Sequence, residues 1–170
     1  EHPDWAIHID EREGVQSRNQ MVLDLSRDEV CEYVINAVSD ILANANIEYV
    51  KWDMNRQLTD MPRLGYNHEY TLGYYKIMSA ITEKFPNILF EGCSAGGGRF
   101  DAGVLAYMPQ IWTSDNSDAI ARLKMQYSTS MCYPVYSISS HVTASPNHQC
   151  GRVTSLKIEG GCCILRNIRI

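Results

Sequence analysis

Short apolar runs alternate with helical stretches along most of this 170-residue chain. Apolar and β-branched composition predicts strands at residues 21–25, 47–53, 88–90, 110–114 and 133–138. Helices are predicted between Ser26 and Asn44, where Ser26 and Glu29 suggest a capping box, and at residues 68–84, 100–107 and 119–125. Repeated alternation with short connections is typical of a parallel α/β fold.

The polar residues gather directly after the predicted strands. Clusters follow four successive strands, at residues 51–55, 93–99, 112–118 and 139–141. A doubly wound sheet carries its ligand at one switch point, whereas a TIM barrel collects side chains from several consecutive strand ends. The pattern therefore favours a partial (β/α)8 TIM barrel. Because a full barrel takes roughly 250 residues, we expect about five of its eight βα units here.

The strand that ends at Asp53 changes from apolar to charged over its last residues. Side chains alternate along a strand, so Lys51, Asp53 and Asn55 share one face. A neighbouring ammonium and an amide donor both favour the ionised form of a carboxyl group. Asp53 is therefore a candidate catalytic carboxylate, and the structural alternative is a Lys51–Asp53 ion pair that serves only the strand end.

A second carboxylate, Asp115, follows the strand predicted at residues 110–114. One ionised and one protonated carboxyl group, placed on either side of a glycosidic bond, are the minimum that glycoside hydrolysis needs. The structural alternative for Asp115 is the N-cap of the following helix. Asp118 offers a division of these roles, since it can cap the helix and leave Asp115 for catalysis.

The glycine-rich segment from Cys93 to Arg99 lacks the Lys-Ser/Thr ending of a P-loop and the spacing of a dinucleotide fingerprint. Its glycines can instead let the backbone approach a neutral ligand such as a sugar ring. Cys93 is also a candidate thiol nucleophile, although the sequence places no histidine as its base. Trp52 and Trp112 flank the two carboxylates, and each is either a platform for a pyranose ring or ordinary packing.

The charge and the cysteine content exclude some classes of partner and bear on the cellular location. The net charge is -5 and no dense Lys/Arg cluster occurs, which argues against nucleic acid or an anionic membrane as a partner. No apolar run is long enough to span a bilayer, and the first residues have neither a Met nor a signal-peptide pattern. The six cysteines have no zinc-site spacing, so we predict no metal. Their pattern favours a reducing compartment, hence a cytoplasmic location.

Four motifs occur in a fixed order: Ser17-Arg18-Asn19-Gln20, Lys51-Trp52-Asp53-Met54-Asn55-Arg56, Cys93-Ser94-Ala95-Gly96-Gly97-Gly98-Arg99-Phe100-Asp101 and Trp112-Thr113-Ser114-Asp115-Asn116-Ser117-Asp118-Ala119. In order and spacing they resemble the motifs of glycoside hydrolase family 36, the α-galactosidases. The similarity extends over nearly the whole chain up to about Leu156. Together the four motifs are specific.

The resemblance implies a (β/α)8 catalytic barrel and retaining, two-step cleavage of terminal α-galactosides such as raffinose and melibiose. It makes Asp53 the nucleophile and Asp115 the acid that becomes the base. The substrate-binding candidates, which include the tryptophan platform and the glycine loop, are Arg18, Lys51, Trp52, Asn55, Cys93, Gly96 and Trp112. The resemblance implies no metal or organic cofactor, and full-length relatives are expected to be homo-oligomers.

The end of the chain departs from the family pattern. Residues 159–170 do not match the family pattern. We therefore assign residues 1–156 to a partial catalytic barrel and residues 157–170 to a divergent tail of unknown structure. The family's upstream residues that grip the sugar hydroxyls are not in this chain, and we expect the isolated chain to have little or no activity. Two alternatives stay open: a raffinose-synthase-type galactosyltransferase and an inactive sugar-binding remnant.

Overall fold

The computed structural model describes residues 2–164 of the chain. These residues divide into two compact units. Unit 1 comprises Glu1–Val50 and Arg56–Leu89, and unit 2 comprises Lys51–Asn55 and Phe90–Ile170, each within the described range. Each unit is described by itself below.

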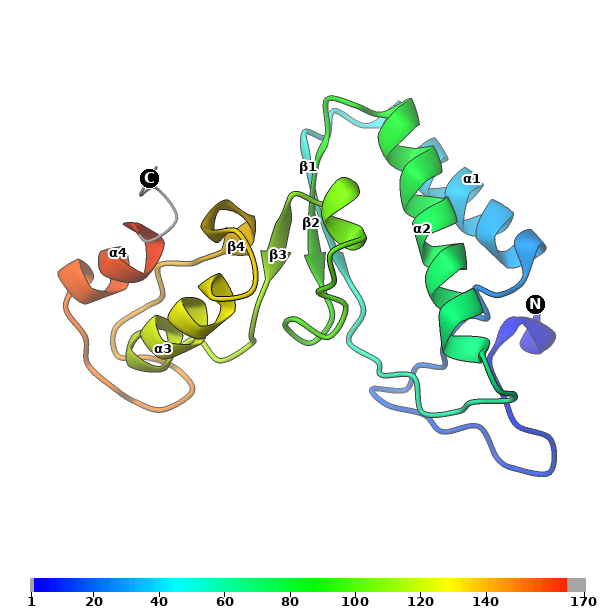
Figure 1. The fold of residues 1–170 in the computed structure, drawn as a ribbon, viewed down its shortest axis with the longest axis horizontal. Helices are drawn as coiled ribbons and strands as arrows, with labels where there is room; N and C mark the ends of the chain where they lie inside the picture. Colours follow the sequence, from blue (N-terminus) through cyan, green and yellow to red (C-terminus); the bar gives the residue numbers. More distant parts are fainter. Residues whose placement is uncertain (1, 165–170) are drawn as a thin grey trace. The chain divides into compact units, whose positions relative to one another are not determined.

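A pair of packed helices, α1 (Asp28–Asn44) and α2 (Tyr66–Lys84), forms the core of unit 1 (Figure 1). Their facing sides supply most of the buried apolar residues of the unit: Val30, Cys31, Leu42, Tyr66, Tyr70, Tyr74, Ile77, Met78 and Ile81. The predicted helix at residues 68–84 is confirmed, with a start two residues earlier. It follows Gly65, which takes a left-handed conformation at φ +82°, and it ends before Pro86.

Close approach of a neighbouring segment explains Gly73 within α2. A Cβ atom at this position would lie 1.8 Å from the backbone oxygen of Leu25. Leu25 itself is buried, and the Cys31 thiol donates to the same backbone oxygen at 3.2 Å. Residue 73 must therefore be glycine for the segment before α1 to pack against α2.

Two predictions for unit 1 are wrong. Residues 21–25 form no strand, because Leu23 makes only an isolated bridge with Ala6. The expected capping box at Ser26 and Glu29 is absent as well. Ser26 donates its hydroxyl to Asp24 at 2.6 Å, Glu29 accepts from Arg27, and α1 begins at Asp28 without a side-chain cap. Nearby side chains thus take both members of the capping pair.

The sheet has four strands in chain order: β1 (Tyr49–Asp53), β2 (Leu89–Cys93), β3 (Gln110–Trp112) and β4 (Ile138–Ser139). The β2–β3 and β3–β4 pairs are parallel, with Gly92 beside Ile111 and Ile111 beside Ile138. The predicted α/β class with a parallel sheet is thereby confirmed. Because the strands are parallel, the polar residues that follow them lie at one edge of the sheet.

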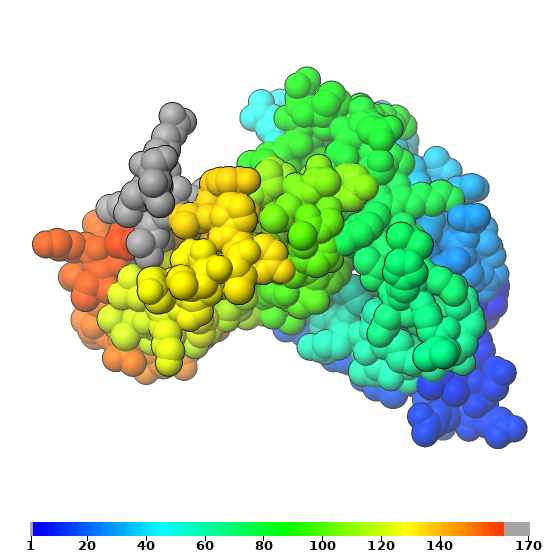
Figure 2. All heavy atoms as spheres, in the orientation of Figure 1, coloured from blue at the N-terminus to red at the C-terminus, as the bar shows by residue number. Residues whose placement is uncertain are grey.

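Helix α3 (Ala119–Ser130) follows β3 in unit 2 and contacts β4 and helix α4 (Leu156–Ile164). The α3 and α4 segments, yellow-green and orange, lie side by side in Figure 2. The helix predicted at residues 119–125 is confirmed and continues to Ser130. No helix among residues 2–164 has the length and apolar character to cross a membrane.

Two predicted elements of unit 2 are shorter than expected. The helix predicted at residues 100–107 is only a 3-10 turn, η2 (Val104–Ala106). The apolar run at residues 133–138 mostly forms the 3-10 turn η3 (Val135–Ser137), because Pro134 starts a turn whose carbonyl accepts from the Ser137 N–H. Only its last residue enters β4. The remaining 3-10 turn, η1 (Pro3–Trp5), lies in unit 1. Of the assigned tail, residues 165–170 lie outside the described range, and that assignment stays a prediction.

Candidate active site

The end of β1 exposes its polar face as the alternation predicts. Lys51 and Asp53 are more exposed than Val50 and Trp52, which lie on the other face of the strand. The Asn55 amide donates from Nδ2 to Asp53 Oδ2 at 2.9 Å. The Asp53 carboxyl group therefore stays accessible while a residue of its own face orients it.

Cys93 occupies the end of β2 and is only 3% exposed. The Met54 N–H donates to the Cys93 carbonyl at 3.1 Å, which holds the ends of β1 and β2 together. Burial raises the pKa of the Cys93 thiol to about 11, and the nearby Asp53 carboxyl group acts in the same direction. The thiol is therefore protonated at neutral pH. This disfavours the alternative of Cys93 as a thiolate nucleophile.

The glycine-rich loop after β2 packs against the backbone that follows β3. Gly97 N–H donates to the Thr113 carbonyl at 3.1 Å. Gly96 has φ +93°, and a Cβ atom there would lie 2.8 Å from Ser114 Cα. Arg99 anchors the other side of the loop by donating from Nη2 to the Cys93 carbonyl at 2.7 Å. Part of the glycine requirement therefore comes from backbone packing, not from a ligand.

Trp112, at the end of β3, donates its indole N–H to Asp115 Oδ1 at 3.0 Å. His141 stacks on its ring at a centroid distance of 3.8 Å, and the Arg122 guanidinium lies 4.1 Å from the same centroid. Protein groups therefore cover the ring, which is only 5% exposed, and Trp112 presents its N–H to Asp115 and not an open platform. Its assignment to the substrate site stays a prediction.

Asp118 is the N-cap of α3, so Asp115 does not have this role. Asp118 Oδ2 accepts from the Ala121 N–H at 3.3 Å, and its other oxygen accepts from Arg152 Nε at 2.9 Å. Asp118 is 7% exposed, whereas Asp115 is exposed. The capping role that the sequence suggested for Asp118 is confirmed, and the catalytic role of Asp115 stays a prediction.

Two amides from a distant segment hold the loop that carries Asp115, and sequence reasoning did not single them out. Gln149 donates from Nε2 to the Asp115 carbonyl at 2.9 Å and accepts from the Ser117 N–H at 2.8 Å. The buried Asn147 accepts from the Gln149 N–H at 2.9 Å. The partners lie more than 30 residues apart in sequence, where no periodic pattern could reveal them.

Sequence reasoning also missed Glu91, in the middle of β2, which is 1% exposed. Its Oε2 accepts from Gln110 Nε2 at 2.7 Å and from Ser139 Oγ at 2.6 Å. Lys51 Nζ lies 3.6 Å from its other oxygen, Oε1. The carboxylate partner of Lys51 is thus Glu91, in place of the Lys51–Asp53 pair that the sequence left open. A charged residue between Phe90 and Gly92, inside an otherwise apolar strand, was the signal available.

Trp52 and Arg18 are the two remaining substrate-site candidates. Trp52 belongs to the opposite face of β1 from Asp53, where it is half-buried, and this favours packing over a role as a platform. Arg18 lies in unit 1, exposed, in a tight turn closed by two hydrogen bonds between Ser17 and Gln20. Its φ of 54° is left-handed, an uncommon conformation for a non-glycine residue. Its assignment to the substrate site stays a prediction.

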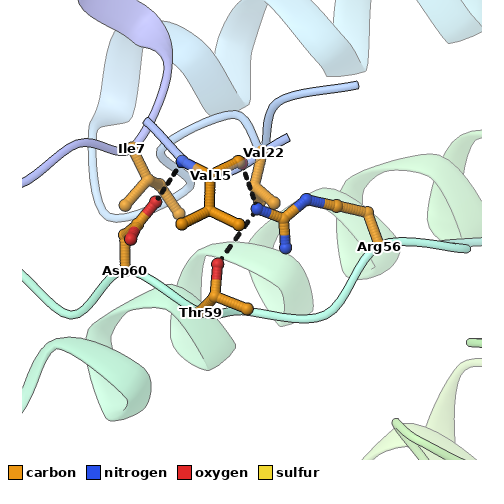
Figure 3. A pocket seen from close by; sticks show the side chains of 6 residues that line it. All are labelled: Ile7, Val15, Val22, Arg56, Thr59 and Asp60. Carbon is orange, nitrogen blue, oxygen red and sulfur yellow. Dashed lines mark hydrogen bonds between the residues drawn. The ribbon is translucent and has the colours of Figure 1, made fainter. Parts of the chain in front are cut away.

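The buried Arg56 is one of the residues that line a small pocket in unit 1 (Figure 3). The Arg56 guanidinium donates to the Val15 carbonyl and, at 3.0 Å, to the Thr59 hydroxyl. The Val15 N–H in turn donates to Asp60 Oδ2 at 3.3 Å. Arg56 therefore ties the segment before the Arg18 turn to the loop of residues 56–60.

No group of three or more His, Cys, Asp or Glu side chains within residues 2–164 is arranged to hold a metal ion. The two candidate carboxylates of unit 2 are Asp53, the last residue of β1, and Asp115, which follows β3, with β2 between these strands. Neighbouring strands lie about 4.8 Å apart, so the ends of β1 and β3 are separated by roughly 10 Å.

Comparison with known proteins agrees with this chemistry. The family model described as Melibiase matches residues 1–169. The α-galactosidase AgaA of Geobacillus stearothermophilus is 54% identical over 167 residues, a match that covers 94% of this chain and 23% of that protein. The bifunctional α-galactosidase/sucrose kinase AgaSK of Mediterraneibacter gnavus is 52% identical over 159 residues, covering 94% of this chain and 17% of that protein.

Solved structures give the same result. A crystal structure of a variant of Geobacillus stearothermophilus AgaA, a GH36 α-galactosidase, in complex with raffinose matches with a TM-score of 0.91 and 52% sequence identity. The match covers 96% of this chain and 24% of that chain. The chain therefore spans about a quarter, or less, of the length of these relatives.

Proposed function

The chain belongs to the melibiase family, and from this premise we propose that it carries the catalytic carboxylates of a retaining α-galactosidase. The substrates are terminal non-reducing α-D-galactosyl residues of galacto-oligosaccharides such as raffinose and melibiose. One observation carries the proposal: Asp53 and Asp115 follow alternate strands, and a donor from a neighbouring residue orients each of them.

In the proposed first step, an Asp53 oxygen attacks the anomeric carbon of galactose and the bond to the leaving oxygen breaks. Asp115 gives its proton to that oxygen. In the second step, Asp115 takes a proton from water, the water oxygen attacks the anomeric carbon, and Asp53 leaves. Two inversions give net retention. The Asn55 amide holds Asp53 for the attack, and the Trp112 N–H holds Asp115 for proton transfer.

We also propose that residues 1–156 are part of a (β/α)8 barrel, with about five of its eight units, and that residues 157–170 are a divergent tail. The strand order β1-β2-β3-β4 supports this, because it follows the chain without the reversal of a doubly wound sheet. A cytoplasmic location is supported by the free cysteines at positions 31, 93, 132 and 150. Homo-oligomerisation of the full-length protein is proposed from the family resemblance alone.

The decisive experiment uses the full-length protein, meaning this chain with any natural flanking sequence. Asp53→Ala should abolish turnover of an aryl α-galactoside. Added azide should restore it and yield β-galactosyl azide, since azide then attacks in place of the missing carboxylate. Asp115→Ala should keep activity on substrates with good leaving groups and yield α-galactosyl azide, since azide now attacks the covalent intermediate.

The matched control is Asp40→Ala, an exposed aspartate on α1, which should keep full activity. The same azide product from both catalytic variants, or equal losses on all leaving groups, would contradict the assigned roles. With sucrose present, accumulation of a galactosylated trisaccharide instead of free galactose would identify a transferase. Galactose binding without turnover by the parent protein would identify an inactive remnant.

A further inference from the structure

Glu91 is a buried carboxylate that the proposed mechanism does not use. It lies in the middle of β2 and is 1% exposed. Removing an ionised carboxylate from water costs several kcal/mol in proteins unless partners compensate for it. Parallel strands covered on both faces are normally apolar, so a carboxylate here needs an explanation from its contacts.

The contacts of Glu91 reach every other strand of the sheet. Gln110 of β3 and Ser139 of β4 donate to Oε2 at 2.7 and 2.6 Å, and Lys51 of β1 lies 3.6 Å from Oε1. Gln110 Nε2 also donates to the Ser139 hydroxyl oxygen at 3.0 Å. The two neutral donors, Gln110 and Ser139, thus hold Oε2 of the carboxylate. The other oxygen, Oε1, faces the Lys51 ammonium.

Oε1 has no hydrogen-bond donor within the described part of the chain. The ammonium at 3.6 Å is therefore the group that compensates its charge. A carboxylate required only for strand packing would be better satisfied by a third neutral donor. The arrangement is that of a fixed anion that attracts a side chain which remains 33% exposed.

Lys51 connects this anion to Trp112, the residue that donates to Asp115. Its ammonium lies 4.8 Å from the centroid of the Trp112 ring, and Trp112 donates to Asp115. It also shares the exposed face of β1 with Asp53, two residues further along. The Lys51 ammonium thus has two fixed neighbours, the Glu91 carboxylate and the Trp112 ring.

We propose that Glu91 is a positioning residue of the site: its buried carboxylate holds the Lys51 ammonium beside Trp112, where it donates to a hydroxyl group of the bound sugar. The inference rests on the proposed function for the identity of the ligand, but not for the Glu91–Lys51 link. An ammonium has three donors and no acceptor, so a sugar hydroxyl oxygen is a suitable partner for it. Glu91 acts only through Lys51 and touches no substrate.

The test is a double-mutant cycle in the full-length protein. Glu91→Gln keeps the shape of the side chain and removes its charge. It should lower kcat/KM on an aryl α-galactoside tenfold or more, and Lys51→Met should lower it by a similar or larger factor. Because Glu91 acts through Lys51, the double variant should have the kcat/KM of Lys51→Met within about twofold. Losses that multiply in the double variant would overturn the proposal.

The control for removing any buried carboxylate is Glu159→Gln. Glu159 is 3% exposed in the same unit, and its oxygens accept from Thr154 and Thr143 hydroxyls at 2.5 and 3.0 Å. No ion pair of Glu159 with a cation is found among residues 2–164. This variant should keep kcat/KM within about twofold of the parent. If Glu91→Gln alone fails to fold, the comparison of the double variant with Lys51→Met remains, because the double variant carries no uncompensated ammonium.

A second readout needs no catalytic activity. Acetylation of the Lys51 amine is measured by mass spectrometry, with the exposed Lys124 as the internal reference. In Glu91→Gln the Lys51 side chain is no longer attracted to a buried carboxylate, so its amine becomes more accessible to the reagent. Lys51 labelling should therefore become at least threefold faster in Glu91→Gln and stay unchanged in Glu159→Gln. Unchanged labelling in Glu91→Gln would overturn the inference, whereas an inactive parent protein would contradict only the proposed function.

Discussion

The helix pair of unit 1 and the strand ends of unit 2 are built on different principles. In the helix pair, contiguous apolar stripes of α1 and α2 bury one another, and most partners are aliphatic or aromatic. At the strand ends, buried side chains such as Glu91, Arg122 and Asp118 are polar, and each makes hydrogen bonds with specific partners. Apolar packing therefore stabilises the helix pair, and hydrogen bonds orient the side chains at the strand ends.

The difference predicts how each region responds to substitution. An apolar interface loses stability in proportion to the volume and contacts removed. A hydrogen-bonded cluster around reacting groups can lose function with little loss of stability, because water or a rearranged side chain can satisfy the orphaned partner. Substitutions in unit 1 should therefore alter the free energy of unfolding, and those at the strand ends should alter catalysis.

Gly73→Ala should give the largest loss of stability. The added Cβ would lie 1.8 Å from the Leu25 backbone oxygen, and backbone cannot move aside as a flexible side chain can. We expect a loss of more than about 4 kcal/mol in the free energy of unfolding, measured by urea denaturation. Gly160→Ala is the matched control in α4, where a Cβ meets no atom within 4 Å. It should stabilise by about 0.5–1 kcal/mol, and similar losses for both would contradict this account.

Ile77→Ala tests the apolar interface without overpacking. Ile77 is 1% exposed on α2, so its truncation leaves a cavity and should cost about 2–5 kcal/mol of unfolding free energy. The same measurement on Leu72→Ala, an exposed leucine on the same helix, should show less than about 1 kcal/mol. If the folded fraction is held equal by low temperature, kcat of the full-length protein should be unchanged.

Trp112→Phe should separate catalysis from stability at the strand ends. Phenylalanine keeps an aromatic ring in contact with His141 and Arg122 but removes the N–H that donates to Asp115. We expect kcat to fall about tenfold to a hundredfold on poor leaving groups, which need protonation, and far less on good ones. Trp5→Phe in unit 1 is the control. A uniform loss across leaving groups would contradict orientation of Asp115 by the indole.

The same contrast explains what could be predicted from the sequence. The α2 helix follows from local information, with Pro86 just beyond its end, and the exposed face of β1 follows from simple alternation. The capping role of Asp118 was also within reach of local spacing. The catalytic roles that the motifs give to Asp53 and Asp115 stay predictions. Apolar patterns and motifs are contained in contiguous residues, so they can be read without a structure.

Long-range polar pairing could not be predicted in this way. Glu91 meets Gln110 and Ser139, which are 19 and 48 residues away. Competition between nearby polar groups was equally hidden, as when Asp24 captures the Ser26 hydroxyl and removes the expected cap. The strand predicted at residues 133–138 failed because Pro134 favours a turn over its apolar neighbours. Partner choice among polar groups depends on tertiary proximity, which composition does not encode.

His141→Gln should have the smallest effect and should appear only as a change of pH dependence. Partial burial lowers the pKa of His141 below its usual value, the positive charges of Lys51 and Arg122 lower it too, and Glu91 opposes them. Below pH 6.5 the unfolded chain therefore binds a proton more readily than the folded protein. Stability from this residue is present above pH 6.5 and is lost as the pH falls through the folded pKa.

The measurement is the free energy of unfolding between about pH 5 and pH 7. The parent should gain stability over this range more steeply than His141→Gln, and the two curves should run parallel above it. Low salt should enlarge the difference, because screening weakens the action of Lys51 and Arg122 on a partly exposed ring. Identical slopes would mean that His141 binds a proton equally readily in the folded and the unfolded chain. This result would contradict the electrostatic difference between the strand ends and unit 1.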